Sequence, residues 1–483
     1  MKKSRLIALI LTVVLMISAC GAMAEANIEW VHIVIDEWPG YKSLLDANGG
    51  LRTAPGSLNA QRGIYVEYHL MNSHIDSSNA LIAGEVVGAG YTVNRFAYLH
   101  SKFEENGVDV VVPFITNYSN GSDGIVATSD ILSVNDLVGK TIAVPEHTEA
   151  QTLVEWLLRN SSLTDAERDQ IRSDMVYFTT PEETGQAFIA GRVDAAGTWE
   201  PFISTAIDIT DGRVLFDTSM STNLILSAVM FRQDFLDTHE EFMTNYIDAA
   251  LEAAAMYKTD FTYAREMPLF SLMTDEEILQ TVNGANLTTW SQNAELLNNE
   301  AISMYEEMAE IWISVGAPAD PARAKTAFTD KYIQNLRSKY EGQETEVTKT
   351  FSEEERSMLI ESPESLLSYS TDIKFELDSF EISNESYEIL DEFVEVARVL
   401  DGAYIQIEGN TSKRASERVT DEMIIGLSES RAQAVANYFE KQGIASERLI
   451  VIGHGDSNPL NKENTAAAEN RRTEIFFKAK MGY

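Results

Sequence analysis

The apolar positions of residues 28–337 change repeatedly between strand-like runs and helical spacing. Residues 30–35 form the first extended apolar run, and residues 36–41 break it before the helical pair at 44–45. Strand and helix signals that alternate over such a length are typical of α/β domains with mainly parallel sheets. We therefore expect an α/β architecture in this part of the chain.

Two helices in this region have recognisable start signals. Residues 141–144 predict a buried strand, and Thr148–Gln151 beyond it have the spacing of a capping box. Residues 153–158 then supply an apolar helix face. A second helix is expected to open at Thr180, with proline in its first turn, and to close at Gly191.

The composition changes near residue 338. Residues 338–371 are rich in Glu, Ser and Thr with little apolar periodicity, which indicates a solvated acidic linker, with a short helix expected around 352–360. A compact unit follows at residues 372–479. Its helix stripe and its alternating final strand at 473–477 predict a small α+β domain whose sheet is covered on one face by helices.

Charge and length narrow the function classes. The 483-residue chain has a formal net charge of −38 and is 44% hydrophobic. The length indicates two or three domains, and the apolar content is enough to fill their cores. A surface this acidic repels phosphate backbones, so nucleic-acid binding is disfavoured. No apolar run after the N-terminus approaches the ~20 residues needed to span a membrane.

The N-terminus has the basic start, apolar run and small-residue end of a secretory signal. Residues 17–20 resemble a bacterial lipobox, which implies cleavage before Cys20 and lipidation of this cysteine, the only one in the chain. The prediction is a lipoprotein signal peptide at residues 1–19 and an exported protein anchored to a membrane, at the cell surface or in the periplasm. An uncleaved anchor helix and ordinary cleavage after residues 22–24 are the alternatives.

Motifs that would indicate catalysis are incomplete. Gly139, Lys140 and Thr141 are similar to the end of a phosphate-binding loop, but Val134 stands where that motif needs a glycine. The seven histidines lack metal-site spacing, and no Gly-x-Ser-x-Gly elbow appears. We therefore expect a protein that is not an enzyme, with no metal ion and no cofactor.

Residues 28–337 resemble the solute-binding proteins of the nitrate/taurine type, which deliver ligands to ABC importers. The resemblance rests on six short stretches in series: residues 36–41, 79–90, 119–127, 136–145, 187–196 and 198–202. It implies a periplasmic-binding-protein-like module of two α/β lobes joined by a hinge, with the second lobe at about residues 116–214. The implied partners are a small-molecule solute, gripped between the lobes, and an ABC permease.

Candidate ligand contacts follow from the strand ends, because ligands bind beyond the carboxyl ends of strands in open α/β sheets. The candidates in these loops are Trp38, Tyr41, Ser77, Ser78, Ser119, Asn120, His147, Thr148, Trp199 and Glu200. Thr148, at a helix start, presents backbone N–H groups that suit an anionic or carbonyl oxygen. Trp38 and Trp199 offer flat walls for a planar or cationic ligand, the alternative being that they are core residues.

The charged residues near these loops leave the class of ligand open. Asp36 and Glu200 are expected to fix loops rather than to contact a ligand. Lys42 and Arg95 are the cations near the candidate loops. A strongly anionic solute, such as a sulfonate, is therefore not assured.

Residues 372–479 resemble the OmpA-like peptidoglycan-binding domain over its full length. The stretches that carry the resemblance are residues 405–411, 427–435, 453–459 and 470–475. In that family, an aspartate and an arginine grip the diaminopimelate of the peptidoglycan stem peptide. A zwitterion of this kind requires one fixed anion and one fixed bidentate cation.

The implied peptidoglycan contacts are Thr411, Ser412, Arg431 and Arg472. Arg431 matches the family's arginine, whereas Ser412 stands at its aspartate and Ile424 at its asparagine. Asp421 or Glu422, in an enlarged loop, could supply the missing anion, and Arg431 could instead be structural. The prediction is wall binding with reduced or altered affinity.

These features together predict a cell-envelope lipoprotein with two binding modules. The first binds a small solute for an ABC importer, and the C-terminal domain attaches to peptidoglycan. The alternative is an envelope tether or sensor scaffold, in which the solute-binding module signals or has lost transport.

Overall fold

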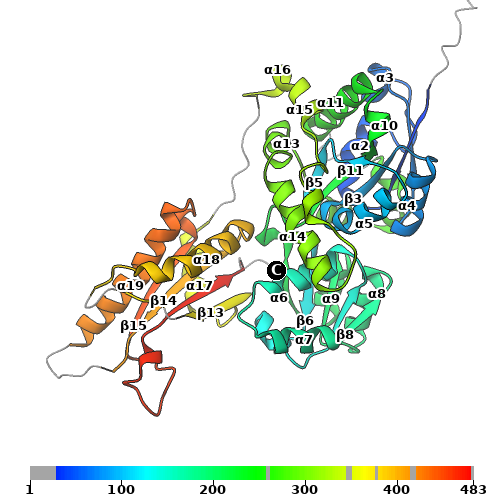
Figure 1. The fold of residues 1–483 in the computed structure, drawn as a ribbon. Helices are drawn as coiled ribbons and strands as arrows, with labels where there is room; N and C mark the ends of the chain where they lie inside the picture. Colours follow the sequence, from blue (N-terminus) through cyan, green and yellow to red (C-terminus); the bar gives the residue numbers. More distant parts are fainter. Residues whose placement is uncertain are drawn as a thin grey trace, which may run out of the picture.

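The computed structural model of this chain contains two α/β lobes and a small α+β domain, as the sequence predicts (Figure 1). It describes residues 29–256, 262–343, 351–371, 373–375, 379–413 and 420–479. The predicted signal peptide at residues 1–19 and the lipidation candidate Cys20 lie outside these residues. Within the described ranges, no helix has the length and apolar character needed to cross a membrane.

Lobe 1 is built on a seven-stranded mixed sheet in the order β12-β5-β11-β3-β1-β2, with β4 paired to β11. Its strands are β1 (Val31–Ile35), β2 (Val66–Leu70), β3 (Gly88–Thr92), β4 (Val110–Val111), β5 (Ile115–Ser119), β11 (Leu226–Arg232) and β12 (Ala285–Leu287). Its helices are α2 (Lys42–Asn48), α3 (Leu58–Gln61), α4 (His74–Ala83), α5 (Val93–Glu105), α10 (Gln233–Leu236), α11 (Glu240–Met256), α12 (Asp275–Asn283), α13 (Trp290–Leu296), α14 (Glu300–Ser314), α15 (Lys331–Asn335) and α16 (Arg337–Tyr340).

Lobe 2 is built on a five-stranded sheet in the order β10-β6-β9-β7-β8. Its strands are β6 (Asp123–Ala127), β7 (Ile142–Pro145), β8 (Met175–Phe178), β9 (Ala195–Trp199) and β10 (Arg213–Asp217). Its helices are α6 (Glu149–Arg159), α7 (Asp165–Ser173), α8 (Pro181–Ile189) and α9 (Phe202–Ile209). The sheet of this lobe therefore spans residues 123–217 rather than the predicted 116–214, because β5 belongs to the sheet of lobe 1.

The prediction of mainly parallel sheets is wrong. β1 is parallel to β2 and β3, and β7 is parallel to β8 and β9. The strands next to the lobe crossings are antiparallel to their neighbours: β11 to β3 and β5, and β6 to β9 and β10. These strands enter a sheet directly from the other lobe, so no covering helix turns the chain back to a parallel direction.

The start signal of α8 is confirmed, and that of α6 is not. At α8, the Thr180 hydroxyl accepts from the Glu183 N–H while the Glu183 carboxylate accepts from the Thr180 N–H, which is a capping box. At α6, the Thr148 hydroxyl donates to a backbone carbonyl at the end of β7. The Gln151 side chain accepts from the His147 N–H, one residue before the expected partner.

Two chain crossings join the lobes and form the hinge. The first, residues 120–122, connects β5 to β6, and the second, residues 218–225, connects β10 to β11. The two crossings are bonded to each other, because the Thr218 hydroxyl accepts from the Gly121 N–H and bonds the Ser119 hydroxyl at 2.7 Å. Both Ser119 and Thr218 are fully buried.

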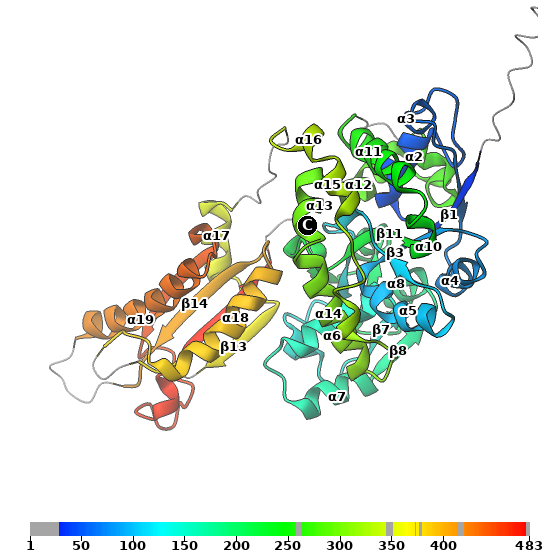
Figure 2. The same cartoon turned by 45° about the horizontal axis from the view of Figure 1, so that its top comes forward.

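Helix α14 runs across both lobes (Figure 2). The Trp312 indole donates to the Asn94 carbonyl in lobe 1 at 2.8 Å. Towards its middle, the helix receives a hydrogen bond from Trp156 of lobe 2, whose indole lies 3.0 Å from the Glu307 carboxylate. This helix therefore supplies a contact between the lobes outside the hinge.

The C-terminal domain has a four-stranded sheet in the order β13-β16-β14-β15. Its strands are β13 (Leu367–Thr371), β14 (Tyr404–Asn410), β15 (Leu449–Gly455) and β16 (Thr473–Lys478), and its helices are α17 (Glu353–Glu361), α18 (Tyr387–Val399) and α19 (Asp421–Lys441). The linker prediction is wrong at its C-terminal end, because β13 pairs along its whole length with β16, whereas α17 confirms the short helix expected around 352–360. The pairing partner lies about a hundred residues later, so local composition conceals this strand.

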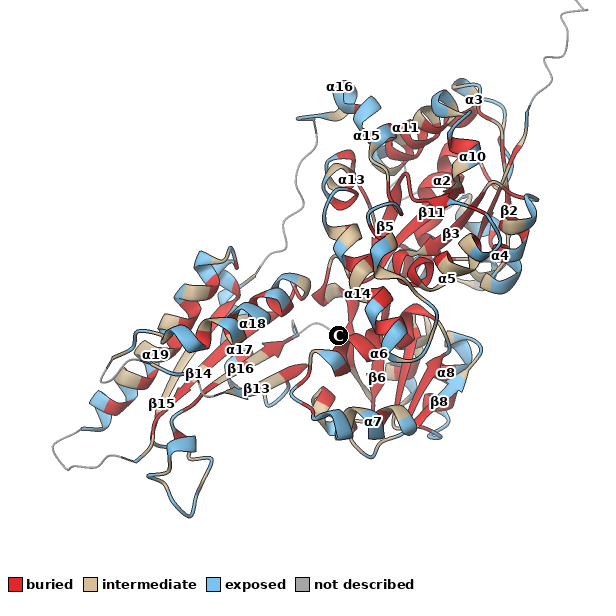
Figure 3. Ribbon diagram, viewed as in Figure 1, coloured by how far each residue is buried: buried red, intermediate tan, exposed pale blue. Residues whose placement is uncertain are grey.

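The C-terminal domain packs against lobe 2 and the hinge. The Asp401 carboxylate accepts from the Thr222 N–H at 2.9 Å and from the Thr222 hydroxyl at 2.6 Å. The Gly402 N–H donates to the Met220 carbonyl, and Glu364 pairs with Arg213 at 2.6 Å. One cluster of buried apolar side chains includes residues of all three units. Figure 3 shows buried residues along the strands of each unit.

Candidate functional sites

A small cavity of about 20 Å³ lies between the two lobes. Lobe 1 and the hinge contribute Asp36, Trp38, Tyr41, Thr92, Ile225 and Ser227, and lobe 2 contributes Asp123, Glu149 and Trp199. This volume holds about one water-sized group, so a larger solute would need the lobes to separate. Trp38, Tyr41 and Trp199 are the predicted ligand contacts that line this cavity.

Trp38 and Trp199 meet from opposite lobes. Their rings are stacked, with centroids 6.0 Å apart and planes inclined by 27°. The Trp38 indole donates to the Asn117 side-chain oxygen at 2.9 Å, which fixes its ring. Gly40 permits this arrangement, because a Cβ there would lie 2.3 Å from the Asn117 side chain. The aromatic wall of the cavity is therefore held in place by lobe 1.

Asp36 and Asp123 give the cavity an acidic wall. Burial raises the pKa of Asp36 to about 6, although Arg95 lowers it by attraction. Burial also raises the pKa of Asp123 to about 7, partly offset by a hydrogen bond from Ser119. Within the described part of the chain, neither carboxylate makes an ion pair, and no group of three or more His, Cys, Asp or Glu side chains is placed to hold a metal ion.

Glu149 is the third carboxylate and links the lobes directly. It lies in the first turn of α6, where the helix dipole stabilises a negative charge. One oxygen pairs with the Arg95 guanidinium of lobe 1 at 2.8 Å, and the other accepts from the Thr92 hydroxyl at 2.7 Å. Its charge is therefore balanced by lobe 1, unlike the charges of Asp36 and Asp123.

Of the predicted contacts in lobe 1, Tyr41 reaches the cavity and two serines do not. Tyr41 lies against β3, where a Cβ on Gly90 would be 2.5 Å from its hydroxyl. Ser77 shares a 2.8 Å hydrogen bond with the Tyr91 hydroxyl, and the Ser78 hydroxyl donates to a backbone carbonyl of its own helix. The two serines support the fold around the site rather than line the cavity.

The structure places two further candidates in the hinge. Ser119 bonds Thr218 and Asp123, as described above. The Asn120 N–H donates to the Gly284 carbonyl at 2.8 Å. Both residues position the crossing between the lobes, and Ser119 also acts on the cavity through Asp123.

The remaining candidates in lobe 2 do not line the cavity. His147 has a left-handed backbone, with φ of 56°, and its ring stacks on Tyr98 at 4.6 Å. Thr148 is buried, and its hydroxyl donates to the backbone carbonyl at the end of β7. The Glu200 carboxylate accepts from the Ser204 N–H and hydroxyl, so it binds the first turn of α9. Asp36 fixes its loop by accepting from the Trp38 N–H, but it lines the cavity as well.

A second cavity, of about 410 Å³, lies in the C-terminal domain. Its lining residues are Ile373, Lys374, Phe375, Ser383, Glu385, Gly409, Asn410, Arg431, Arg471, Arg472 and Thr473. The Arg431 guanidinium lies 5.0 Å from the centre of the Phe375 ring, and its Nε donates to the Ser379 carbonyl. Lys374 pairs with Glu385 at 3.1 Å, so the cationic groups outnumber the single carboxylate in this wall.

Arg472 and Asn410, near the ends of β16 and β14, each leave a polar atom without a hydrogen bond among the described residues. Arg472 is buried and pairs with Glu474 at 2.9 Å, while its Nε makes no hydrogen bond among the described residues. Asn410, at the end of β14, donates to Glu474, and its side-chain oxygen is likewise unbonded. Groups of this kind are available to a ligand with both donors and acceptors.

Thr411 and Ser412 lie at the edge of this cavity rather than in its wall. Thr411 is buried, and the Ser412 hydroxyl accepts from Arg471 at 3.3 Å. Asp421 and Glu422, considered as substitute anions, are exposed in the first turn of α19 and do not line the cavity. Sequence reasoning missed Lys374 and Asn410, of which Asn410 ends β14 next to the predicted Thr411.

Comparison with known proteins identifies this domain. The model of the OmpA family matches residues 374–473. The peptidoglycan-associated lipoprotein of Haemophilus influenzae is 31% identical over 107 residues, which are 22% of this chain and 67% of that protein. The chain belongs to the OmpA family. The corresponding lipoprotein of Pseudomonas putida is 32% identical over 116 residues, 24% of this chain and 67% of its own length.

The two-lobed part of this OmpA-family protein has more distant relatives. A protein of Brucella abortus named as a binding protein is 26% identical over 225 residues, 44% of this chain and 66% of that protein. The aliphatic sulphonate binding protein SsuA of Escherichia coli is similar in structure at 15% identity and a TM-score of 0.48, over 61% of this chain and 97% of that one. The nitrate-binding protein NrtA of Synechocystis has a TM-score of 0.49 at 13% identity, over 65% of this chain and 90% of that one.

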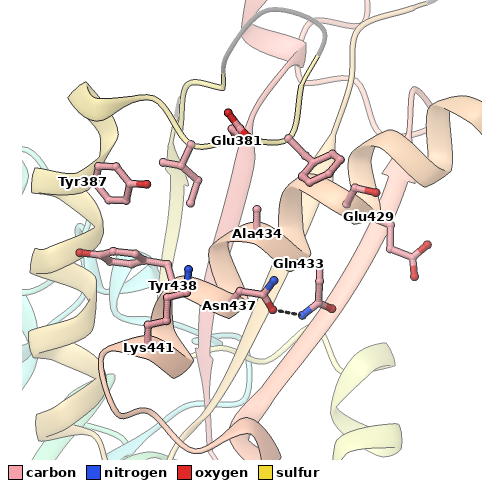
Figure 4. Close-up of a pocket in the computed structure, with 11 residues that line it drawn as sticks. Glu381, Tyr387, Glu429, Gln433, Ala434, Asn437, Tyr438 and Lys441 are labelled. Atoms are coloured by element: carbon pink, nitrogen blue, oxygen red, sulfur yellow. Dashed lines mark hydrogen bonds between the residues drawn. The ribbon is translucent and has the colours of Figure 1, made fainter.

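The OmpA-family domain has another hollow, of about 590 Å³, between α19 and the segment that leads to the start of α18 (Figure 4). Tyr387 and Tyr438 form one end of it, with ring centres 5.1 Å apart. Gln433 and Asn437 are bonded to each other along α19 at 2.9 Å. None of the predicted site residues lines this hollow, so it is separate from the cavity that contains Arg431.

Proposed function

We propose that the two lobes bind a small solute in the cavity between them. The observation that carries this proposal is the composition of the cavity wall, because the Trp38–Trp199 pair and the acids Asp36 and Asp123 converge there from different lobes. A site shared between lobes couples solute binding to lobe closure. The Brucella abortus relative, named as a binding protein, supports this role.

The second half of the proposal is attachment to the cell wall. The OmpA family membership and the peptidoglycan-associated relatives support an exported envelope protein whose C-terminal domain binds the peptidoglycan stem peptide. Arg431 and Arg472 would bind the carboxylates of that peptide, since guanidinium groups form bidentate hydrogen bonds with carboxylates. Delivery to an ABC permease and a lipid anchor at Cys20 complete the proposed role as an importer component.

A sensor scaffold is the second candidate, and one contact favours it. Asp401 of the C-terminal domain bonds Thr222, which lies in the second hinge crossing. Movement of the hinge would therefore change a contact of the wall-binding domain. A sensor of this type would bind its solute without a requirement for a permease.

Thermal unfolding of the full chain with candidate solutes tests the solute-binding role. A solute at 100 times its dissociation constant should stabilise the folded chain by about 2.7 kcal/mol. The variant Trp199→Leu should lose this stabilisation, whereas Tyr387→Leu, in the hollow of Figure 4, should retain it. If sulfonates, nitrate, amines and sugars all leave the unfolding midpoint unchanged, the solute-binding role is contradicted.

A pull-down on purified peptidoglycan tests the wall-binding role. The full chain should be retained, and free stem peptide with an exposed diaminopimelate should release it. Retention that survives a large excess of free peptide would indicate a different ligand. Co-purification of the chain with a permease in detergent distinguishes an importer component from a sensor. An importer component should co-purify with the permease, and a sensor should not.

A further inference from the structure

We propose that the cavity between the lobes selects a small organic cation, with an ammonium group as the part that is recognised. This inference rests on the proposed solute-binding role and specifies the chemical class of its ligand. Three independent features of the cavity wall support it.

The first feature is the balance of charge. Asp36, Asp123 and Glu149 line the cavity, and no cationic side chain is part of its wall. Glu149 is already paired with Arg95, at 2.8 Å. Asp36 and Asp123 have no ion-pair partner among the described residues. Buried carboxylates that no ion pair neutralises are costly, and a cationic ligand would reduce that cost.

The second feature is the aromatic pair. Trp38 is only 7% exposed, and its stacked partner Trp199 belongs to the other lobe. Tryptophan faces attract organic cations more strongly than other aromatic rings do. They also give close contact to the methyl or methylene groups next to an ammonium nitrogen. A bare metal ion gains nothing from such a wall, since it requires oxygen, nitrogen or sulfur ligands.

The third feature is an unused polar group. Ser227 on β11 is 2% exposed, lines the cavity, and its hydroxyl has no partner among the described residues. A buried hydroxyl without a partner is unfavourable. A donor on the ligand, or a hydroxyl next to its ammonium group, would satisfy it. Asp36, Asp123 and Ser227 therefore place three oxygen-bearing acceptor groups around one small space.

The test compares ligands that differ in charge but not in shape. Choline, ethanolamine and putrescine are the cationic probes, and 3,3-dimethyl-1-butanol is the neutral counterpart of choline. Methanesulfonate and nitrate are the anionic probes, and calcium chloride is the metal arm. Thermal unfolding of the full chain should shift upwards by several degrees with at least one cation, and should not shift with the neutral, anionic or metal probes.

Two variants and one matched control locate the effect. Asp123→Asn keeps the shape of the side chain and should weaken cation binding at least tenfold, and Trp199→Leu should do the same without a change in charge. Glu155→Gln should retain the shift, because Glu155 is a buried carboxylate on the same helix as Glu149 but pairs with Arg172, outside the cavity.

The outcomes separate this inference from the function on which it rests. If an anion stabilises the chain and Trp199→Leu abolishes its effect, the lobes do bind a solute and the cation inference is overturned. Stabilisation by calcium alone, or by the neutral alcohol as strongly as by choline, also overturns it. If no probe of any charge shifts the midpoint, both the cation inference and the solute-binding role are contradicted.

Discussion

The cavity between the lobes and the cavity that contains Arg431 are opposite in charge and differ in size. The cavity between the lobes has a volume of about 20 Å³ and an acidic wall with Asp36 and Asp123. The cavity of the C-terminal domain has a volume of about 410 Å³ and is lined by several cations, Arg431 and Arg472 among them. The chain as a whole has a net charge of −38. Net charge therefore describes the surface, whereas the ligand class of each cavity is set locally by the charged side chains that line it.

The largest expected effect is on wall binding. Arg431→Gln should reduce retention on purified peptidoglycan by about tenfold or more, because a lost charge-assisted bidentate contact is worth roughly 1.5–3 kcal/mol. Sedimentation of the full chain with peptidoglycan measures it. Lys441→Gln, in the hollow of Figure 4, is the control and should bind as the wild type does. Equal retention of both variants would remove Arg431 from the site.

The next effect is on the stability of the fold, which the buried acidic side chains of the cavity between the lobes lower. Asp123→Asn should raise the free energy of unfolding at pH 8 by roughly 1–4 kcal/mol, because the raised pKa of this carboxyl disfavours its charged form in the folded chain. The folded state binds the proton more tightly than the unfolded state, so the gain should shrink as pH falls from about 7 towards 4. Urea unfolding at several pH values measures it, and a gain that is equal at pH 4 and pH 8 would contradict this origin.

The pH dependence of cation binding sharpens the same contrast. Asp36 and Asp123 have pKa values of about 6 and about 7, so both are charged at pH 8 and protonated at pH 5. Arg95 stays protonated across this range, because its pKa is raised by the carboxylates of Glu149 and Asp36. The affinity for choline, whose own charge does not titrate, should therefore fall by roughly tenfold or more from pH 8 to pH 5. Calorimetric titration at each pH tests this, and a constant affinity would exclude both carboxylates.

The smallest expected effect is a gain. Ser412 stands at the position of the aspartate that the OmpA resemblance implies, and its hydroxyl bonds Arg471. Ser412→Asp should raise retention on peptidoglycan by about threefold. The new carboxylate would pair with the ammonium group of the stem peptide, and an exposed ion pair contributes roughly 0.2–1 kcal/mol. Ser412→Asn is the uncharged control. A gain of the same size in both variants would show that charge is not the cause.

The sequence pattern predicted the elements better than the contacts between them. The start of α8 at Thr180 was predictable because both members of its capping box lie within four residues. The strand β13 and the antiparallel strands at the hinge were missed because their partners lie far along the chain. Local periodicity carries no information on such partners.

The candidate site was predicted in part for the same reason. The rule that ligands lie beyond strand ends led to Trp38, Tyr41 and Trp199. The same rule reaches Asp36, at the end of β1, but an acid in a loop is usually solvated, and it was interpreted as fixing the loop. Asp123 was not a candidate, because its place beside Asp36 and Trp38 arises only when the hinge brings the two lobes together. Its signal in the sequence is an acid at the first position of an otherwise apolar strand.

The most direct test of the account is a double comparison of two variants and two ligands in the full chain. Asp123→Asn should lose cation binding by calorimetry and keep wild-type retention on peptidoglycan. Arg431→Gln should keep the cation affinity and lose retention. The claim of two separate sites with opposite charge selectivity is contradicted if either variant impairs cation binding and peptidoglycan retention equally. It is also contradicted if Asp123→Asn keeps cation binding and Arg431→Gln keeps retention.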